Sequence, residues 1–173
     1  PAKYAADIVS ATSTSIDAKE FEIVADELRQ ITDSSNKIRT IDCFDISHFQ
    51  GNAIVGSCIR FTHGKPEKDK FRRFAIKTLT NQNDYAALQE IVQRRYQNND
   101  DLPDLILIDG GKGQLNAVKQ IMPHALCVSL AKREERLFTP LYPEGITLDV
   151  KTGVGKLLLA LRDYAHHFAI RYH

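Results

Sequence analysis

The sequence predicts an α/β fold in which helices flank a mixed five-stranded sheet. Three observations support this class. Short runs of apolar and β-branched residues, typical of buried strands, recur along the chain. The first three runs are joined by short connections, which favour antiparallel strands. The later runs alternate with segments whose apolar residues recur at helical spacing, and this alternation favours parallel strands.

We divide the chain into residues 1–36, a linker and N-terminal helix, and a domain at 37–173. The small polar residues of the first part are typical of a linker. A helix is predicted at 17–32, because apolar residues recur there three and four positions apart. Asp17 followed by Glu20 is typical of a helix-capping box.

Three strands are predicted next, at residues 38–44, 53–61 and 70–76. Gly51 with the following asparagine separates the first two, and a turn at Gly64 separates the last two. Connections this short favour an antiparallel meander.

Helices and strands alternate in the next part of the chain. A helix at 84–96 carries apolar residues on one face. A strand at 105–109 is followed by a helix at 113–122, which ends at Pro123. A strand is predicted at 125–131.

The C-terminal part begins with residues 137–150, a predicted hairpin or excursion around a Pro-Glu-Gly turn. A last helix is expected at 155–173. The chain starts at a proline and stops within this helix, so we expect an excised fragment of a longer protein.

This order of elements, a three-stranded meander followed by strand–helix units, is typical of the ribonuclease H-like fold, in which the fourth strand lies parallel beside the first. Asp45 and Asp109 are predicted to end these two strands, and open α/β sheets bind ligands outside the carboxyl ends of their strands. A buried carboxylate is costly unless it is paired. Two adjacent ones therefore indicate a Mg²⁺ or Mn²⁺ site and phosphodiester chemistry. The alternative is that each aspartate only caps a turn. Ser47 and Gln50 flank Asp45 and are candidates for orienting it.

The last helix offers two histidines as a third member of this site. Its apolar stripe consists of Leu158, Leu161, Ala165, Phe168, Ala169 and Tyr172. His167 lies nearly opposite this stripe and should face solvent, whereas His166 lies at its edge and can reach a neighbouring site. The alternative is a structural histidine at the boundary of the core.

The composition is that of an ordinary soluble protein, with 43% hydrophobic and 26% charged residues. A net charge of +1 is low for a domain that binds nucleic acid strongly by itself. Cys43, Cys58 and Cys127 form no CxxC pair and are predicted to be reduced, buried thiols, which fits a cytosolic compartment. We find no signal peptide and no apolar run of the ~20 residues that a membrane span requires.

The glycine-rich turn after Asp109 lacks the spacing and the terminal Gly-Lys-Ser/Thr of a nucleotide-binding P-loop. It is better explained as a tight turn that approaches a phosphate group at a helix N-terminus. If the substrate of the predicted phosphodiester chemistry is DNA, the candidate contacts to its backbone are Lys112, Arg72, Arg73, Lys132 and Arg133. The alternative for each of them is a solvated charged face.

Four stretches of the sequence match one known family. They are CFDISH at 43–48, FRRF at 71–74 followed by DYAA at 84–87, LPDLILIDGGKGQL at 102–115, and RDYAHHFAI at 162–170. Together they resemble the C-terminal endonuclease half of UvrC, the nuclease subunit of the bacterial UvrABC excision-repair system.

The resemblance implies a ribonuclease H-like endonuclease that makes the 5′ incision beside a DNA lesion in bacterial nucleotide excision repair, in the cytoplasm. The family's catalytic and metal-binding residues would fall on Asp45, Asp109 and His166. It implies damaged double-stranded DNA as substrate and a UvrB–DNA complex as partner of the full-length protein, with no membrane and no nucleotide. His166 has three open roles: metal ligand, general base, or proton donor to the leaving oxygen.

The chain departs from the family pattern at three positions beside this triad. Phe49 replaces a threonine or similar residue, Tyr164 a glutamate, and His167 often an arginine. Two other functions stay open: a different ribonuclease H-like nuclease, such as an endonuclease V-type or RNA-hybrid enzyme, and a non-catalytic relative that docks on DNA or UvrB.

Overall fold

A computed structural model describes residues 16–49, 53–76, 83–98 and 101–171 of the chain. Its helices of ten residues or more are α2 (Ala18–Thr32), α3 (Asp84–Tyr96), α4 (Lys112–Ile121) and α5 (Gly153–Ile170). Its strands are β1 (Thr40–His48), β2 (Ile54–Thr62), β3 (Lys65–Pro66), β4 (Arg72–Ile76), β5 (Leu105–Asp109), β6 (Cys127–Ala131), β7 (Arg136–Phe138) and β8 (Ile146–Thr147). Two short 3₁₀ turns, η2 (Lys68–Lys70) and η3 (Arg133–Glu135), complete the described part.

The strands form one mixed sheet in the order β3-β2-β1-β5-β6-β7-β8, with β4 beside β2. β1, β2 and β4 are antiparallel neighbours, which confirms the meander. β5 lies parallel beside β1, and β6 lies parallel beside β5. The five strands expected from the sequence are thus present, and the short strands β3, β7 and β8 extend the sheet. β7 and β8 form the predicted hairpin.

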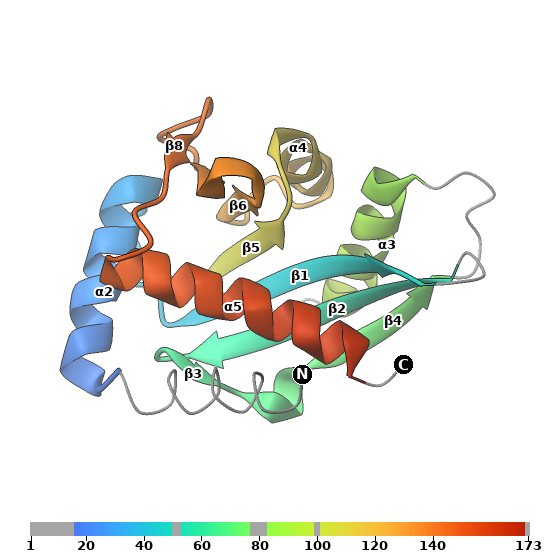
Figure 1. The fold of residues 1–173 in the computed structure, drawn as a ribbon, viewed down its shortest axis with the longest axis horizontal. Helices are drawn as coiled ribbons and strands as arrows, with labels where there is room; N and C mark the ends of the chain where they lie inside the picture. The colour runs from blue at the N-terminus through green and yellow to red at the C-terminus, as the bar shows by residue number, and fades with distance from the viewer. Residues whose placement is uncertain (1–15, 50–52, 77–82, 99–100, 172–173) are drawn as a thin grey trace.

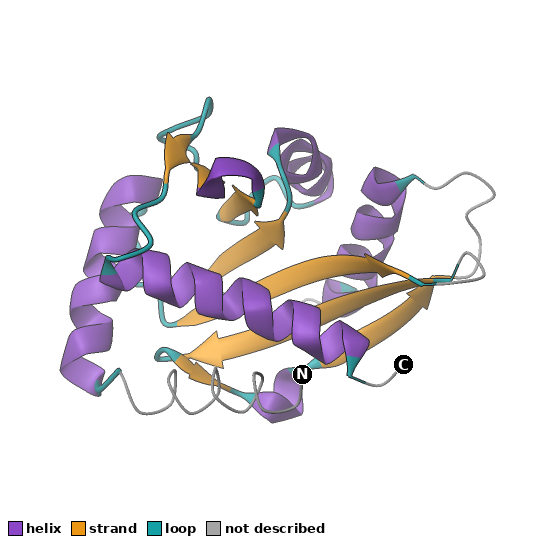
Figure 2. Ribbon diagram, viewed as in Figure 1, coloured by secondary structure: helices purple, strands orange, loops and turns teal. Residues whose placement is uncertain are grey.

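Helices cover both faces of this sheet. α2 and α5 pack on one face and α3 and α4 on the other, and α5 crosses in front of β1 and β2 (Figure 1). Colouring by secondary structure shows the same layers around the central strands (Figure 2). One apolar cluster lies under α2 and α5, around Leu28, Phe61 and Leu161. The other lies under α3 and α4, around Phe44 and Ile91.

The ends of the helices lie within two residues of the prediction, except that α5 ends at Ile170 and not at residue 173. The Asp17 carboxylate accepts a hydrogen bond from the Glu20 backbone N–H at 2.8 Å, which confirms a cap at the start of α2. α5 begins two residues earlier than expected, because Thr152 caps it by accepting a hydrogen bond from the Gly155 N–H at 3.0 Å. The predicted linker lies almost wholly outside the described residues, and the division of the chain at residue 37 stays a prediction.

The largest difference between the predicted and observed strand ends concerns Asp45; the other strand ends lie within two residues of the prediction. The sequence placed Asp45 at the end of the first strand, but β1 continues through it to His48. β2 pairs with β1 along its whole length, from Thr40 opposite Thr62 to His48 opposite Ile54. Because these ladder bonds satisfy the backbone, the strand continues past the polar side chain. β5, by contrast, ends at Asp109 as predicted.

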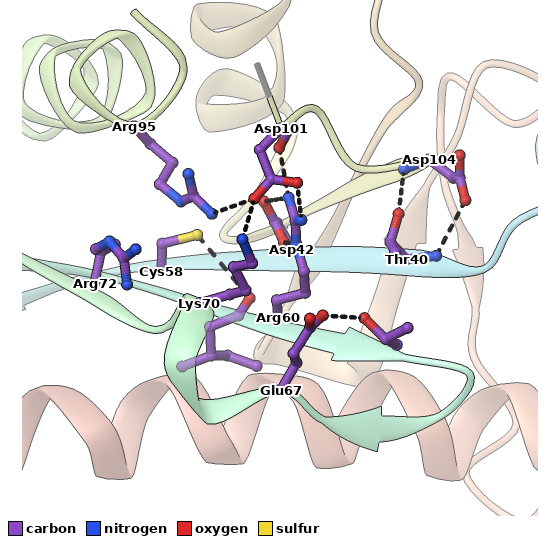
Figure 3. A network of polar contacts seen from close by, with 12 residues as sticks. Thr40, Asp42, Cys58, Arg60, Glu67, Lys70, Arg72, Arg95, Asp101 and Asp104 are labelled. Atoms are coloured by element: carbon purple, nitrogen blue, oxygen red, sulfur yellow. Dashed lines mark hydrogen bonds and ion pairs between the residues drawn. The ribbon is translucent and has the colours of Figure 1, made fainter. Parts of the chain in front are cut away.

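A network of ion pairs, built on the buried pair of Arg60 and Asp42, joins the strands on the α3 side (Figure 3). Arg60 donates to Asp42 at 2.6 and 3.0 Å and to Asp101 at 2.6 Å, and the Tyr96 hydroxyl donates to Asp42 at 2.5 Å. Lys70 also lies 3.1 Å from Asp101. Hydrogen bonds and ion pairs with Arg60 lower the pKa of Asp101. The network thereby holds the segment before β5, which contains Asp101, against strands β1 and β2 of the meander.

The three cysteines are free and buried, as predicted. Burial raises the pKa of all three thiols, so each is a neutral packing residue. None of the helices in the described part of the chain has the length and apolar content that crossing a bilayer requires.

Candidate active site

Asp45 and Asp109 lie on adjacent parallel strands and face the same side of the sheet. The last Cα partners between β1 and β5 are Phe44 and Ile108, so the aspartates are the next residues on each strand. Side chains alternate along a strand, and Cys43, two residues before Asp45, belongs to the core cluster under α5. The two carboxylates therefore emerge together beneath α5, although 64 residues (109 − 45) separate them in sequence.

The electrostatics show how close the carboxylates are. Burial, then repulsion from Asp45 and a hydrogen bond with it, raise the pKa of Asp109 to about 7. The positive charges of Lys132 and Arg162 partly oppose this rise. A carboxyl group that keeps its proton up to near neutral pH beside a second carboxylate forms a site in which a cation can replace that proton.

His166 enters the same site from α5. Its Nδ1 lies 3.4 Å from Asp45 Oδ2, and the Ser47 hydroxyl donates to the same oxygen at 3.2 Å. The His166 side chain is 43% exposed, whereas that of Asp45 is only 6% exposed. The hydrogen bond with Asp45 raises the pKa of His166, against the effect of burial. The structure thus brings together the three residues singled out in the sequence.

The chemistry of this donor set suits a hard divalent cation. Carboxylate oxygens are the ligands that Mg²⁺ and Mn²⁺ prefer, and an imidazole at the margin is compatible with Mn²⁺. In the described residues, however, no three His, Cys, Asp or Glu side chains are gathered closely enough to enclose a metal by themselves. The residues present therefore fit a cation held by the two aspartates and completed by water or substrate oxygens.

The turn of α5 that carries His166 is tied to its surroundings at two points that sequence reasoning missed. The Ser57 hydroxyl donates to the Ala165 carbonyl at 3.0 Å. Arg162 forms a bidentate ion pair with Glu135, in which its two terminal nitrogens lie 2.6 and 3.3 Å from the carboxylate oxygens. Ser57 could have been noticed as a polar residue in the otherwise apolar β2 run. Glu135 lies in a charged segment, and no sequence feature distinguished it from its neighbours.

The five candidate DNA contacts are not equivalent. Arg73 lies over the Phe168 ring of α5, 4.6 Å from its centroid, on the side of the sheet that carries the carboxylates. Lys132 directly follows β6, and its positive charge lowers the pKa of both Asp109 and His166. The structure thus places these two cations on the α5 side, near the carboxylates.

Arg72, Lys112 and Arg133 differ from these two. Arg72 is the Cα partner of Cys58, whose side chain packs on the α3 side, and Arg72 is drawn with the network there (Figure 3). Lys112 pairs with Glu144 at 2.8 Å. Arg133 is exposed in η3.

Two of the departures from the family pattern, Tyr164 and His167, have different surroundings. Tyr164 packs edge-on against Phe61 and Phe71, with ring centroids 5.3 and 6.1 Å apart, in the core under α5. The His167 ring lies 6.0 Å from that of His166. Gln50 lies outside the described residues.

Comparison with known proteins gives consistent matches. The family model described as the UvrC RNAse H endonuclease domain matches residues 29–170. The UvrABC system protein C of Methanococcus maripaludis is 38% identical over 165 residues, which cover 91% of this chain and 31% of that protein. Its counterpart in Chlorobaculum tepidum is 42% identical over 156 residues, covering 86% of this chain and 25% of that protein.

The chain therefore spans about a quarter to a third of the length of these curated relatives. Among solved structures, endonuclease V of Ciona intestinalis in complex with an inosine-containing 24mer DNA has a TM-score of 0.47 and 16% identity. The alignment covers 66% of this chain and 55% of that one.

Proposed function

The chain belongs to the family of UvrC RNase H endonuclease domains, and from this we propose that it makes the 5′ incision beside a lesion in nucleotide excision repair. The substrate is damaged double-stranded DNA, and the reaction is metal-dependent hydrolysis of one phosphodiester bond. In the full-length protein the domain acts on a UvrB–DNA complex. The names of the relatives support the repair system, and the family description supports the nuclease activity.

The observation that carries this proposal is the pairing of Asp45 and Asp109 on adjacent strands with His166 above them. Asp45 and Asp109 would hold Mg²⁺ or Mn²⁺, with His166 as a marginal third ligand or as the group that exchanges a proton. When bound, the cation would lower the pKa of a water molecule and neutralise charge on the phosphate. Because the His166 Nδ1 is directed at Asp45, Nε2 is the ring nitrogen left to exchange a proton with the attacking water or the leaving oxygen.

The surrounding residues give the site its polarity. Ser47 donates to the Asp45 carboxylate and so orients it. Lys132 and Arg73 supply positive charge on the α5 side of the sheet, which suits contact with the DNA backbone. Lys112 is a weaker candidate, because a DNA phosphate would have to displace Glu144 from it.

The test replaces each carboxylate in the full-length protein, assembled in the complete repair complex on a lesion-containing duplex. Asp45→Asn and Asp109→Asn should each abolish the 5′ nick while DNA binding remains. Asp26→Asn is the matched control, because Asp26 is an exposed aspartate of α2 with one weak partner. Retained Mn²⁺-dependent nicking in either site variant overturns the assignment, as does efficient cutting of an RNA–DNA hybrid without partner proteins.

A further inference from the structure

The position of His166 depends on where α5 lies, and little else restrains it. Its side chain is 43% exposed, so core packing holds the ring only on one side. Its contact with Asp45, at 3.4 Å, is at the long end of the range for a hydrogen bond. A small displacement of this turn of the helix would therefore break the contact.

Ser57 anchors this turn to the sheet. Ser57 is the direct Cα partner of Asp45 across β1 and β2, and its side chain is fully buried. Its hydroxyl donates to the carbonyl of Ala165, the residue before His166, at 3.0 Å. One hydrogen bond thus connects the strand position beside the catalytic carboxylate to the helix position beside the histidine.

Glu135 anchors the same turn from the other side. Arg162 lies one helical turn before His166, and both of its terminal nitrogens reach the Glu135 carboxylate. Glu134 and Glu135 adopt left-handed backbone angles, with φ of 63° and 45°. Such a conformation is unfavourable for residues other than glycine, so the ion pair stabilises a strained turn against the helix. The Glu135 carbonyl also accepts from the Leu148 N–H at 2.9 Å, which fixes the turn to the β7–β8 segment.

We propose that Ser57 and Glu135 are positioning residues that fix the 162–166 turn of α5, and with it His166, over the two carboxylates. The inference rests on the proposed function and deepens it, because it assigns the geometry of the third catalytic group to residues outside the triad. Neither residue touches the substrate. Each acts through the helix backbone or through Arg162.

The size of the effect follows from the sensitivity of catalysis to geometry. A misplacement of about 1 Å costs on the order of 100-fold in rate. Loss of one of two anchors allows a smaller shift, so we expect Ser57→Ala and Glu135→Gln each to lower the rate of nicking by about 10-fold or more. DNA affinity should not change, because the substrate contacts remain.

Thr139 provides a matched control. Its hydroxyl donates to the Ile31 carbonyl of α2 at 2.8 Å, and its side chain is buried. Thr139→Val, like Ser57→Ala, removes one buried hydroxyl that holds a helix in place, but at a different helix; this hydroxyl also accepts from the Tyr142 N–H at 3.0 Å. A general loss of stability should therefore affect both variants alike, whereas a loss of positioning should affect only Ser57→Ala.

The first measurement is the single-turnover nicking rate at saturating enzyme, together with DNA affinity, for the full-length protein in its complete repair complex. The second needs neither metal nor substrate. In the metal-free 173-residue chain, the NMR signals of the His166 ring should shift or broaden in Ser57→Ala and Glu135→Gln but not in Thr139→Val. The exposed His124 serves as an internal reference. Glu135 is partly exposed, so its substitution keeps the test valid if Ser57→Ala folds poorly.

The outcomes separate this inference from the proposed function. Slow nicking, unchanged DNA affinity and altered His166 signals in the two variants support it. If Ser57→Ala and Glu135→Gln match Thr139→Val in nicking rate and in the NMR signals of the His166 ring, the inference is overturned, even if Asp45→Asn is inactive. Normal nicking by Asp45→Asn refutes the proposed function itself, and the inference with it.

Discussion

Replacing Asp109 by asparagine should stabilise the metal-free protein while abolishing its activity. The pKa of Asp109 rises from 3.8 to about 7 in the folded state, first because of burial and then because of Asp45. The folded protein therefore holds this proton more tightly than the unfolded chain does. Its contribution to stability is fully present below pH 3.8 and is lost as the pH rises through about 7. Asparagine carries no charge at any pH and avoids this loss.

The magnitude follows from the pKa. The interval from 3.8 to about 7 spans roughly 3 pH units, and each is worth about 1.4 kcal/mol. The upper bound is therefore about 4 kcal/mol of unfolding free energy at pH 8. Relaxation around the carboxylates reduces this value, so we expect Asp109→Asn to be about 1–4 kcal/mol more stable than the wild type at pH 8. The two proteins should be nearly equal in stability at pH 4.

The assay is urea denaturation of the metal-free chain at several pH values from 4 to 8. The quantity of interest is the difference in unfolding free energy between variant and wild type, because titrating groups that do not interact with Asp109 cancel in it. Asp26→Asn, at an exposed site, should show a difference near zero throughout. Adding Mn²⁺ should stabilise the wild type but not Asp109→Asn. A variant less stable than the wild type at pH 8, or a difference that does not change with pH, refutes the reasoning.

Two further predictions concern other parts of the molecule. Asp42→Asn removes the fully buried partner of Arg60 and leaves it Asp101, which is partly exposed; this should cost about 3–5 kcal/mol in urea denaturation. Removing the exposed ion pair by Glu90→Gln should cost less than about 1 kcal/mol, and equal effects would contradict this explanation. Arg73→Ala, which leaves Phe168 without its cation, should weaken DNA binding and lower the slope of log affinity against log salt by about 1. An unchanged slope in fluorescence anisotropy would exclude a phosphate contact.

The sequence predicted most of the fold because local signals and tertiary structure agree. The strand 105–109 and the helix 84–96 have the boundaries expected from their apolar patterns. The main error, at Asp45, arose because a polar residue was taken to end a strand. Pairing with β2 decides that boundary, and the partner strand is invisible to any local pattern.

The candidate site was predicted less completely. The positions of Asp45 and Asp109 were inferred from the order of strands, and His166 was chosen over its neighbour from the helical wheel. Lys132 was singled out only as a basic residue. Its effect on the site became visible when β6 was placed beside β5.

By itself, the sequence determined which residues are candidates for the chemistry and which elements carry them, because periodicity and turn signals are local. The tertiary structure alone decided how α5 is held over the carboxylates. Ser57 and Ala165 are 108 residues apart, and Arg162 and Glu135 are 27 apart. A contact between such distant positions depends on how sheet and helices pack, so no spacing in the sequence reveals it.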